Sequence, residues 1–380
     1  MKSMTAYREH FPIFKNTVYI NSCSYAALSV EVEAAFLEYL KDRHEVGADW
    51  INWCDRLERV RALFAELLSA KVDEIAVTTS ASASLSAISS SLDFSGPRKK
   101  IITTDLAFPT EAQAWHALKK HGADVVHVKE KDGMIDLEDL DRLVDETTLL
   151  VAIPLVCYRN GALADVPAIR DIARKKGALI LVDAYQGVGA VPIDVAEWDV
   201  DFIVGGSLKY LLSTAGVGFL YVREDLISKS NPTQTGWFAQ EDIHAMLIHD
   251  NIPASNARRF EQGTPSVPNL YAVEAGLKMI LEVGVENIRT YVAALNERLK
   301  EGVQKIGGTL ASPLDPDKHG AMLAIASTDE HALVAKLAER NIIASCRGGN
   351  IRISAHFYNN DQDIDAVIAA LEENKSLLRR

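Results

Sequence analysis

The stretch DFIVGGSLKYLLSTAGVGFLYV, residues 201–222, places one lysine, Lys209, between two apolar runs and shortly after a pair of glycines. Both runs are rich in β-branched and aromatic residues, which predicts two buried strands. A lysine is rarely buried without a partner, because removing its charge from water costs several kcal/mol. The sequence therefore indicates that Lys209 either reaches solvent or is covalently occupied.

Similar short apolar runs recur through the first two thirds of the chain and alternate with helical patterns. One such pattern, residues 55–70, repeats its apolar residues at steps of three and four and so predicts an amphipathic helix. The runs show no strict alternation with polar residues, which is typical of strands covered on both faces. We therefore expect an α/β fold with a mostly parallel central sheet flanked by helices. The expected strands lie within residues 73–79, 100–105, 124–129, 149–156, 178–184, 201–206 and 216–222.

The pattern changes after RRFEQGTPSVPN, residues 258–269. A long helical region follows over residues 270–306, and short apolar runs at 321–327 and 350–357 predict strands. Two prolines between Thr264 and Asn269 mark a domain boundary there. We expect a large domain over residues 16–264 and a smaller α+β domain over residues 265–380, with residues 1–15 packing near the small domain.

Composition and charge exclude several classes of function. The chain has 380 residues and a formal net charge of -12, which disfavours nucleic acid and anionic membrane as partners. The N-terminal residues lack the apolar core of a signal peptide, and the longest apolar run is too short to span a bilayer. The four cysteines are scattered without a CxxC pair, which argues against a disulfide framework or a zinc ribbon, and we expect no metal. These features predict a cytoplasmic protein.

Polar residues follow three of the expected strands, at the edge of the sheet where ligands of α/β proteins bind. They are Asp183, Lys209 and the TTSASAS segment, residues 78–84. Taken singly, each has an ordinary interpretation as a turn residue, a solvated lysine or a helix N-cap. Together they indicate one ligand with an aldehyde, a basic ring nitrogen and an anionic group, which describes pyridoxal 5'-phosphate.

Six stretches, in this order along the chain, resemble the class V aminotransferase family of fold-type I pyridoxal phosphate enzymes. This family includes cysteine desulfurases, kynureninases and isopenicillin N epimerase-like proteins. VDAYQ, which holds Asp183, followed by a strand ending in SLKY, which holds Lys209, is the most specific part of the resemblance. The stretches are residues 16–29, 73–85, 105–115, 160–195, 201–211 and 258–265.

The resemblance implies a role for each matching residue. Lys209 would form the Schiff base and carry the proton at the substrate Cα, while Asp183 would face the ring nitrogen of the cofactor and keep it protonated. The other matching residues would contact the cofactor: Phe108 on the ring face, Gln186 near the phenolic oxygen, and Ser80, Ala81, Ser82 and Ser207 near the phosphate. Without the resemblance, Phe108 is equally well explained as a core residue and Gln186 as a loop residue.

One position departs from the family pattern. The residue before the lysine is often a phosphate-binding His or Tyr, and here it is Leu208. In the family the neighbouring subunit also contributes to the phosphate site, and Trp237 and Thr264 match those positions. The resemblance therefore implies a homodimer with shared active sites.

Arg352 lies in NIRISAHF, residues 350–357, where alternation alone puts its side chain on the solvent face of a half-buried strand. The resemblance instead makes it the residue that binds the α-carboxylate of an amino-acid substrate, a role suited to the planar guanidinium group. We favour the second interpretation.

Several reactions fit this pattern. We expect a small amino acid to undergo transamination or β-elimination, with a kynureninase-like C–C hydrolase or an epimerase as alternatives. A cysteine desulfurase is less favoured, because Cys346 precedes Arg347 and no cysteine follows it in the 345–352 segment. A dehydrogenase is disfavoured because Pro192 takes the place of the third glycine of its motif. An inactive scaffold or a protein that only binds the cofactor is the non-enzyme alternative.

Overall fold

The structure, a computed structural model, describes residues 4–380. Its centre is a sheet of seven strands in the order β2-β10-β9-β8-β7-β3-β4. Every one of the seven runs expected from the sequence forms one of these strands, and the α/β fold class is confirmed. The strands are β2 (Ile75–Thr78), β3 (Lys100–Thr104), β4 (Asp124–Val128), β7 (Thr148–Pro154), β8 (Leu179–Asp183), β9 (Phe202–Gly206) and β10 (Gly218–Val222).

Strands β9, β8, β7, β3 and β4 run parallel, and β10 is antiparallel to both of its neighbours. Because β9 and β10 are antiparallel, a short connection joins them, and this connection carries Lys209. The parallel strands are instead joined by crossovers, which place their carboxyl ends along one edge of the sheet. Asp183 ends β8 at that edge, and Lys209 follows β9 there.

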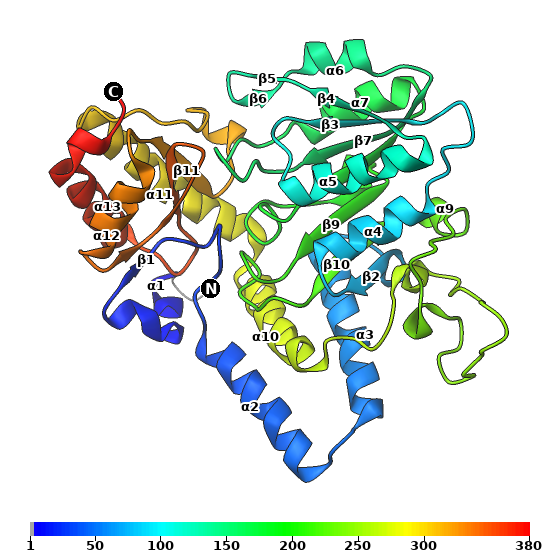
Figure 1. Ribbon diagram of the computed structural model, residues 1–380. Helices are drawn as coiled ribbons and strands as arrows, with labels where there is room; N and C mark the ends of the chain where they lie inside the picture. Colours follow the sequence, from blue (N-terminus) through cyan, green and yellow to red (C-terminus); the bar gives the residue numbers. More distant parts are fainter. Residues whose placement is uncertain (1–3) are drawn as a thin grey trace.

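Helices cover both faces of the sheet (Figure 1). The helix α4 (Ala81–Ser91) and the helix α5 (Pro109–Ala117) pack on one face, where Leu85 and Trp115 are fully buried. The opposite face packs against four other helices. They are α3 (Trp50–Leu67), α6 (Leu137–Leu143), α7 (Val166–Lys175) and α10 (Val267–Val283).

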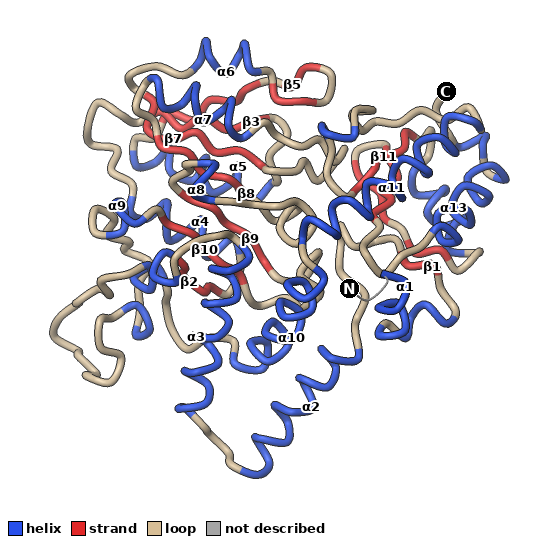
Figure 2. The backbone as a smooth tube through the Cα atoms, turned by 180° about the vertical axis from the view of Figure 1, so that it is seen from behind, coloured by secondary structure: helices blue, strands red, loops and turns tan. Residues whose placement is uncertain are grey.

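The second part of the chain has a three-stranded antiparallel sheet of its own, separate from the large sheet in Figures 1 and 2. The helices α11 (Val285–Lys305), α12 (Glu330–Ala338) and α13 (Asp361–Glu373) pack against one face of it. Its strands are β11 (Met322–Ala326), β13 (Ser345–Arg347) and β14 (Asn350–Ser354), with β14 in the middle.

The long helical region expected over residues 270–306 is two helices, which meet at Gly284 with φ of 83°. α10 packs its apolar side into the core of the large sheet, whereas most of α11 packs against the small one. The domain boundary expected between residues 264 and 265 stays a prediction. Core packing alone favours a domain boundary near Gly284.

The N-terminal segment lies against the small domain. Arg8 pairs with Asp363 of α13 at 2.6 Å, and β1 (Val18–Tyr19) pairs in parallel with β12 (Ile342–Ile343). The first three residues of the segment expected to pack there lie outside the described residues. Among residues 4–380, no helix combines the length and the apolar character needed to cross a bilayer.

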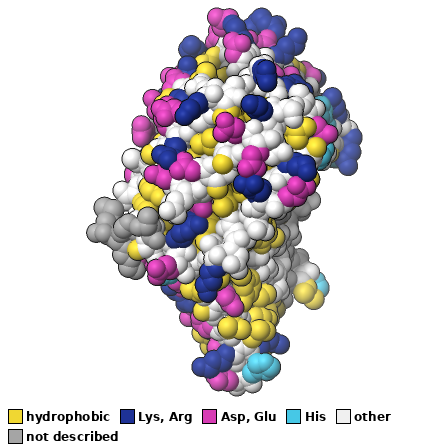
Figure 3. Space-filling view, turned by 90° about the vertical axis from the view of Figure 1, so that its left-hand side faces the viewer, with side chains coloured by type: hydrophobic (Ala, Val, Ile, Leu, Met, Phe, Trp, Pro, Cys, Tyr) yellow, Lys and Arg dark blue, Asp and Glu magenta, His cyan; other side chains and the backbone are white. Residues whose placement is uncertain are grey.

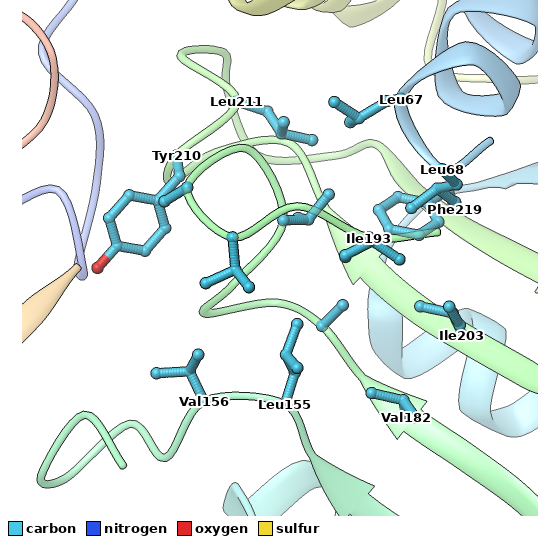
Figure 4. Packing of buried hydrophobic residues seen from close by; sticks show 14 of the residues in the cluster. Leu67, Leu68, Leu155, Val156, Val182, Ile193, Ile203, Tyr210, Leu211 and Phe219 are labelled. Atoms are coloured by element: carbon cyan, nitrogen blue, oxygen red, sulfur yellow. The ribbon is translucent and has the colours of Figure 1, made fainter. Parts of the chain in front are cut away.

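The connection after β9 is tied to the small domain. Figure 4 shows the Tyr210 side chain pointing away from the apolar cluster formed by Leu155, Val182 and Leu211. Its hydroxyl lies 2.8 Å from Ser354 Oγ, and its carbonyl oxygen lies 3.0 Å from Nε2 of the buried His356. Two contacts from β14 and the segment after it therefore fix the residue next to Lys209.

Candidate active site

Lys209 extends into a cavity of about 300 Å³ at the carboxyl edge of the large sheet. The cavity brings together residues from α4, α5, β8 and the connection after β9, which are far apart in the sequence. Seven of its lining residues were expected at a cofactor site from the sequence: Ser80, Ala81, Ser82, Phe108, Asp183, Gln186 and Lys209.

The Lys209 ammonium has no hydrogen bond or ion pair within residues 4–380. Its Nζ lies 4.4 Å from the centre of the Tyr185 ring and 5.8 Å from that of Phe108. Burial lowers the pKa of Lys209 to about 8, although the negative charge of Asp183 opposes this shift. On the order of a tenth of this amine is therefore neutral, and so nucleophilic, at pH 7, far more than for an ordinary lysine.

Asp183 is buried at the end of β8, and the backbone N–H of Tyr185 donates to its Oδ1 at 2.9 Å. Burial raises the pKa of Asp183, while the hydrogen bond and the charge of Lys209 lower it. Within residues 4–380, Oδ2 makes no hydrogen bond. This oxygen can therefore accept a hydrogen bond from a cationic ring nitrogen in the cavity.

Gln186 is buried beside the cavity and is held at one end of its amide. Its Nε2 donates to the Cys23 carbonyl oxygen at 3.0 Å, while its Oε1 is buried without a partner in the described part of the chain. A buried carbonyl oxygen without a donor is costly unless a ligand supplies one. The amide is thus a ready acceptor facing the same space as Lys209.

The N-terminus of α4 forms one end of the cavity. Ser80 caps the helix, its Oγ accepting from the Ala83 N–H at 3.1 Å, as the N-cap interpretation of the serine-rich segment expects. The N–H groups of the first turn, at Ala81 and Ser82, precede the helical hydrogen bonds and lie beside the cavity. Such N–H groups and the helix dipole favour an anion.

Gly218 on β10 is necessary for this arrangement. A Cβ at this position would lie 2.6 Å from the Ser80 carbonyl carbon and 2.9 Å from the Ala81 nitrogen. The N-terminus of α4 can therefore approach the sheet only because residue 218 has no side chain.

Phe108 is the N-cap residue of α5, and its ring is 41% exposed, so it is not a core residue. The ring meets Tyr158 edge to face, with ring centroids 5.0 Å apart and planes at 83°. The two aromatic side chains form a wall of the cavity on the side facing Lys209.

Arg352 is only 4% exposed, so the solvent-face position expected from alternation alone is wrong. Both faces of β14 are covered, because Ile351 and Ile353 pack against the helices of the small domain while the face that carries Arg352 lies against the large domain. The guanidinium donates to the Tyr158 carbonyl oxygen at 3.0 Å and to Ser345 Oγ at 2.8 Å, and its Nε is buried without a partner among the described residues. No carboxylate within residues 4–380 pairs with it, so a carboxylate ligand would complete its hydrogen bonding.

Three residues assigned by resemblance lie outside this cavity. The Ser207 hydroxyl is buried and shares its one proton between two acceptors, the carbonyl oxygens of Thr214, at 2.8 Å, and Val217, at 3.0 Å. Trp237 packs against Trp50, with ring centroids 5.6 Å apart, and Thr264 is exposed. Within one chain, none of the three faces Lys209.

Sequence reasoning missed three side chains at or next to the cavity. Tyr158 follows the β7 strand, Tyr185 stands between Asp183 and Gln186, and Glu111 lies three residues after Phe108. Each occurs within or beside a stretch that was singled out, and position after a strand end was the available signal for Tyr158 and Tyr185 but not for Glu111, which lies on α5. Glu111 is fully buried on α5, and its Oε1 accepts from Thr103 Oγ1 at 3.2 Å.

The cavity thus combines a buried amine, a buried carboxylate and a helix N-terminus on an α/β sheet, a site suited to a phosphorylated aldehyde cofactor. The family model "Aminotransferase class-V" matches residues 41–367. The chain belongs to the class V aminotransferase family, as its sequence resemblance implied.

Two curated relatives and one solved structure illustrate the range of this similarity. The chain is 34% identical to "Uncharacterized aminotransferase YcbU" of Bacillus subtilis, with 94% of each chain covered. It is 29% identical to a kynureninase of Geobacillus thermodenitrificans, over 91% of this chain and 85% of that protein. The fold matches that of a cysteine desulfurase from Thermococcus onnurineus with a TM-score of 0.90 at 24% identity, over 99% of both chains.

Family membership confirms the expected cofactor, pyridoxal 5'-phosphate, and the protein is a pyridoxal phosphate-dependent enzyme. The residues present fit this group. The amine of Lys209 lines one cavity with the N-terminus of α4, the Asp183 Oδ2 and the Gln186 Oε1, and neither oxygen has a hydrogen-bond partner within residues 4–380.

Proposed function

We propose that Lys209 attaches the cofactor covalently and that the other cavity residues hold it by its polar groups. Asp183 would bind the protonated ring nitrogen, Gln186 would bind the phenolic oxygen, and Phe108 would cover one face of the ring. The phosphate would lie at the N-terminus of α4, against Ser80, Ala81 and Ser82. When bound, the cofactor supplies an electron sink for a bond broken at the Cα of an amino acid.

The substrate in this proposal is a small amino acid whose α-carboxylate binds Arg352. The buried guanidinium lacks a carboxylate partner in the described chain, and two hydrogen bonds already orient it. Lys209 would take the proton from the substrate Cα and return it at a later step. The observation that carries the proposal is the unpaired Lys209 amine, with its pKa lowered to about 8, in one cavity with Asp183.

The proposed reaction is a transamination or a β-elimination, since both begin with removal of the Cα proton. Persulfide transfer is disfavoured by the position of Cys346. Its Sγ lies 3.5 Å from His331 Nδ1 on α12, and burial raises the pKa of the thiol, whereas a persulfide acceptor needs a thiolate. The segment is also a tight hairpin with Gly348 and Gly349 at its turn rather than a long loop that could reach the cavity.

The attachment is tested by reducing the holoenzyme with borohydride and mapping its peptides by mass spectrometry. A reduced cofactor on the peptide that contains Lys209 is the expected result. An adduct on a different lysine, or none, would refute the proposal. A screen of amino acids for keto acid, ammonia, sulfide or alanine release then identifies the reaction, and alanine released from kynurenine would establish the C–C hydrolase alternative, which the kynureninase relatives suggest.

We also infer that the enzyme is a homodimer. Hydrophobic side chains gather over the lower part of the molecule in Figure 3, where α2 (Val30–Glu45) projects. Exposed apolar residues on α2, at the start of α3 and in the loop before residue 253 have the character of a covered interface. They include Leu37, Leu40, Val46, Trp50, Ile51, Met246, Ile248 and Ile252. Thr264 and Trp237, which face no site within one chain, would then approach the cavity of the partner.

Sedimentation combined with an activity assay tests the dimer. A monomer that retains full activity at assay concentration would overturn this inference. For localisation we propose the cytoplasm, because four free cysteines suit a reducing compartment.

A further inference from the structure

The ring of Tyr185 occupies space that a side chain at residue 206 would otherwise fill. A Cβ at Gly206 would lie 2.5 Å from Cε2 of Tyr185 and 2.6 Å from its Cζ and Oη. The end of the ring that carries the hydroxyl therefore rests directly on β9. This placement depends on the glycine three residues before Lys209.

The same region of the sheet receives the N-terminus of α4. Gly206 pairs with Gly218 across the antiparallel ladder of β9 and β10, so substituents at the two positions would project from the same face. A Cβ at Gly218 would lie 2.9 Å from the Ala81 nitrogen. The Tyr185 hydroxyl and the Ala81 N–H thus rest on adjacent, paired glycines at one end of the cavity.

The Tyr185 hydroxyl is available to a ligand. Its Oη makes no hydrogen bond within residues 4–380, although the side chain lines the cavity. Burial raises the pKa of Tyr185 to about 12, with a smaller contribution from Asp183, so the hydroxyl remains protonated and can donate at neutral pH. Its ring lies under Lys209 Nζ at 4.4 Å, so it faces the space next to the reactive amine.

The other residues near Lys209 offer few donors to an anion at this end. Leu208 lines the cavity but has no polar side-chain atom, and the Ser207 hydroxyl is committed to two backbone carbonyl oxygens. We propose that Tyr185 binds the cofactor phosphate through its hydroxyl, beside the N–H groups of α4, with its ring packed under the pyridine ring opposite Phe108. This inference rests on the proposed position of the phosphate at α4.

Tyr185→Phe removes only the hydroxyl and keeps the ring. We expect the dissociation constant of pyridoxal 5'-phosphate, measured by absorbance on the apo-protein, to rise about 10–100-fold, as for loss of a hydrogen bond to a charged group. Affinity for pyridoxal, which lacks the phosphate, should stay within about twofold by the same reasoning. Tyr291→Phe, which removes a hydroxyl bonded to the Asn359 carbonyl oxygen in the small domain, is the matched control and should change neither value.

Ser82→Asp separates this inference from the phosphate position on which it rests. An acidic residue in the first turn suits the helix dipole, so the fold is preserved, but its charge repels a phosphate there. Weaker binding of the phosphorylated cofactor alone in both variants supports the inference. If Ser82→Asp loses affinity for pyridoxal 5'-phosphate and Tyr185→Phe does not, the role of Tyr185 is overturned. Unchanged affinity for pyridoxal 5'-phosphate in Ser82→Asp overturns the phosphate position. An equal loss of affinity for pyridoxal 5'-phosphate and for pyridoxal in Tyr185→Phe shows that the hydroxyl does not bind the phosphate.

Discussion

Glu111 of α5 is buried close enough to Asp183 of β8 for the two charges to interact. Burial, and then the charge of Asp183, raises the pKa of Glu111 to about 8. Glu111 is therefore mostly protonated at neutral pH, and a single negative charge, that of Asp183, faces the proposed position of the ring nitrogen. Above pH 8 a second charge develops behind Asp183 and has no cationic partner among the described residues.

Glu111→Gln should remove a pH dependence from stability. A carboxyl whose pKa is raised on folding stabilises the protein below its unfolded pKa, and this contribution is lost as pH rises toward 8. The free energy of unfolding of the wild type should fall by about 2 kcal/mol more than that of the variant between pH 6 and pH 8.5. Urea denaturation at both pH values measures the difference, and parallel pH dependence of the two proteins would contradict it.

The reactivity of Lys209 should follow its lowered pKa. Only the neutral amine attacks the cofactor aldehyde, so the rate of attachment to the apo-protein should rise about tenfold per pH unit below pH 8 and level off above it. Stopped-flow absorbance between pH 6.5 and 10 gives this profile. A rate that continues to rise to pH 10, as for an ordinary lysine, would show that burial does not lower this pKa.

Arg352→Lys should weaken substrate binding and leave cofactor binding intact. Lysine cannot keep the hydrogen bonds to Tyr158 and Ser345 while offering two parallel donors to a carboxylate. We expect KM for the amino acid to rise about 100-fold, from loss of a bidentate charged contact. Arg340→Lys, at an exposed arginine paired with Glu373 in the same domain, is the control, and equal KM values in both variants would exclude the carboxylate role.

Gly218→Ala should displace the N-terminus of α4. The added methyl group would lie 2.6 Å from the Ser80 carbonyl carbon, and backbone atoms cannot move aside as a flexible side chain can. We expect a loss of about 1–3 kcal/mol in unfolding free energy and weaker cofactor binding. Gly96→Ala is the comparison, because a Cβ there meets no atom within 4 Å. Similar stability of the two variants would argue against the close approach.

The spacing of apolar residues predicted most of the secondary structure, because buried positions recur at the period of the helix or strand that contains them. Strands covered on both faces read as continuous apolar runs, so Phe202 to Val204 in β9 are recognisable in isolation. The division of the long helical region at Gly284 was missed, since glycine within a helical pattern does not by itself show a change of direction. The sequence also did not show which of the two hydrophobic cores α10 packs into, because its apolar residues indicate burial but no particular neighbour.

The site residues that follow strands were predicted from the sequence. Those whose position depends on tertiary packing were missed. Asp183 and Lys209 follow strands, and the rule for α/β sheets brings such residues together. Alternation alone put Arg352 on a solvent face, because Tyr158, which lies against this face of β14, is distant in sequence. The commitment of the Ser207 hydroxyl to backbone carbonyl oxygens is likewise a property of the folded connection.

The order of the strands along the chain, the family and the chemical groups available to the cofactor could all be inferred from residue type and local period. Which of these groups are free to act depends on contacts that form when the chain folds. Burial in the folded protein lowers the pKa of Lys209 and, together with the charge of Asp183, raises the pKa of Glu111. Packing on Gly206 of β9 likewise positions the Tyr185 hydroxyl, which makes no hydrogen bond within residues 4–380. Electrostatic energies depend on distance and solvent exclusion, which local sequence does not encode.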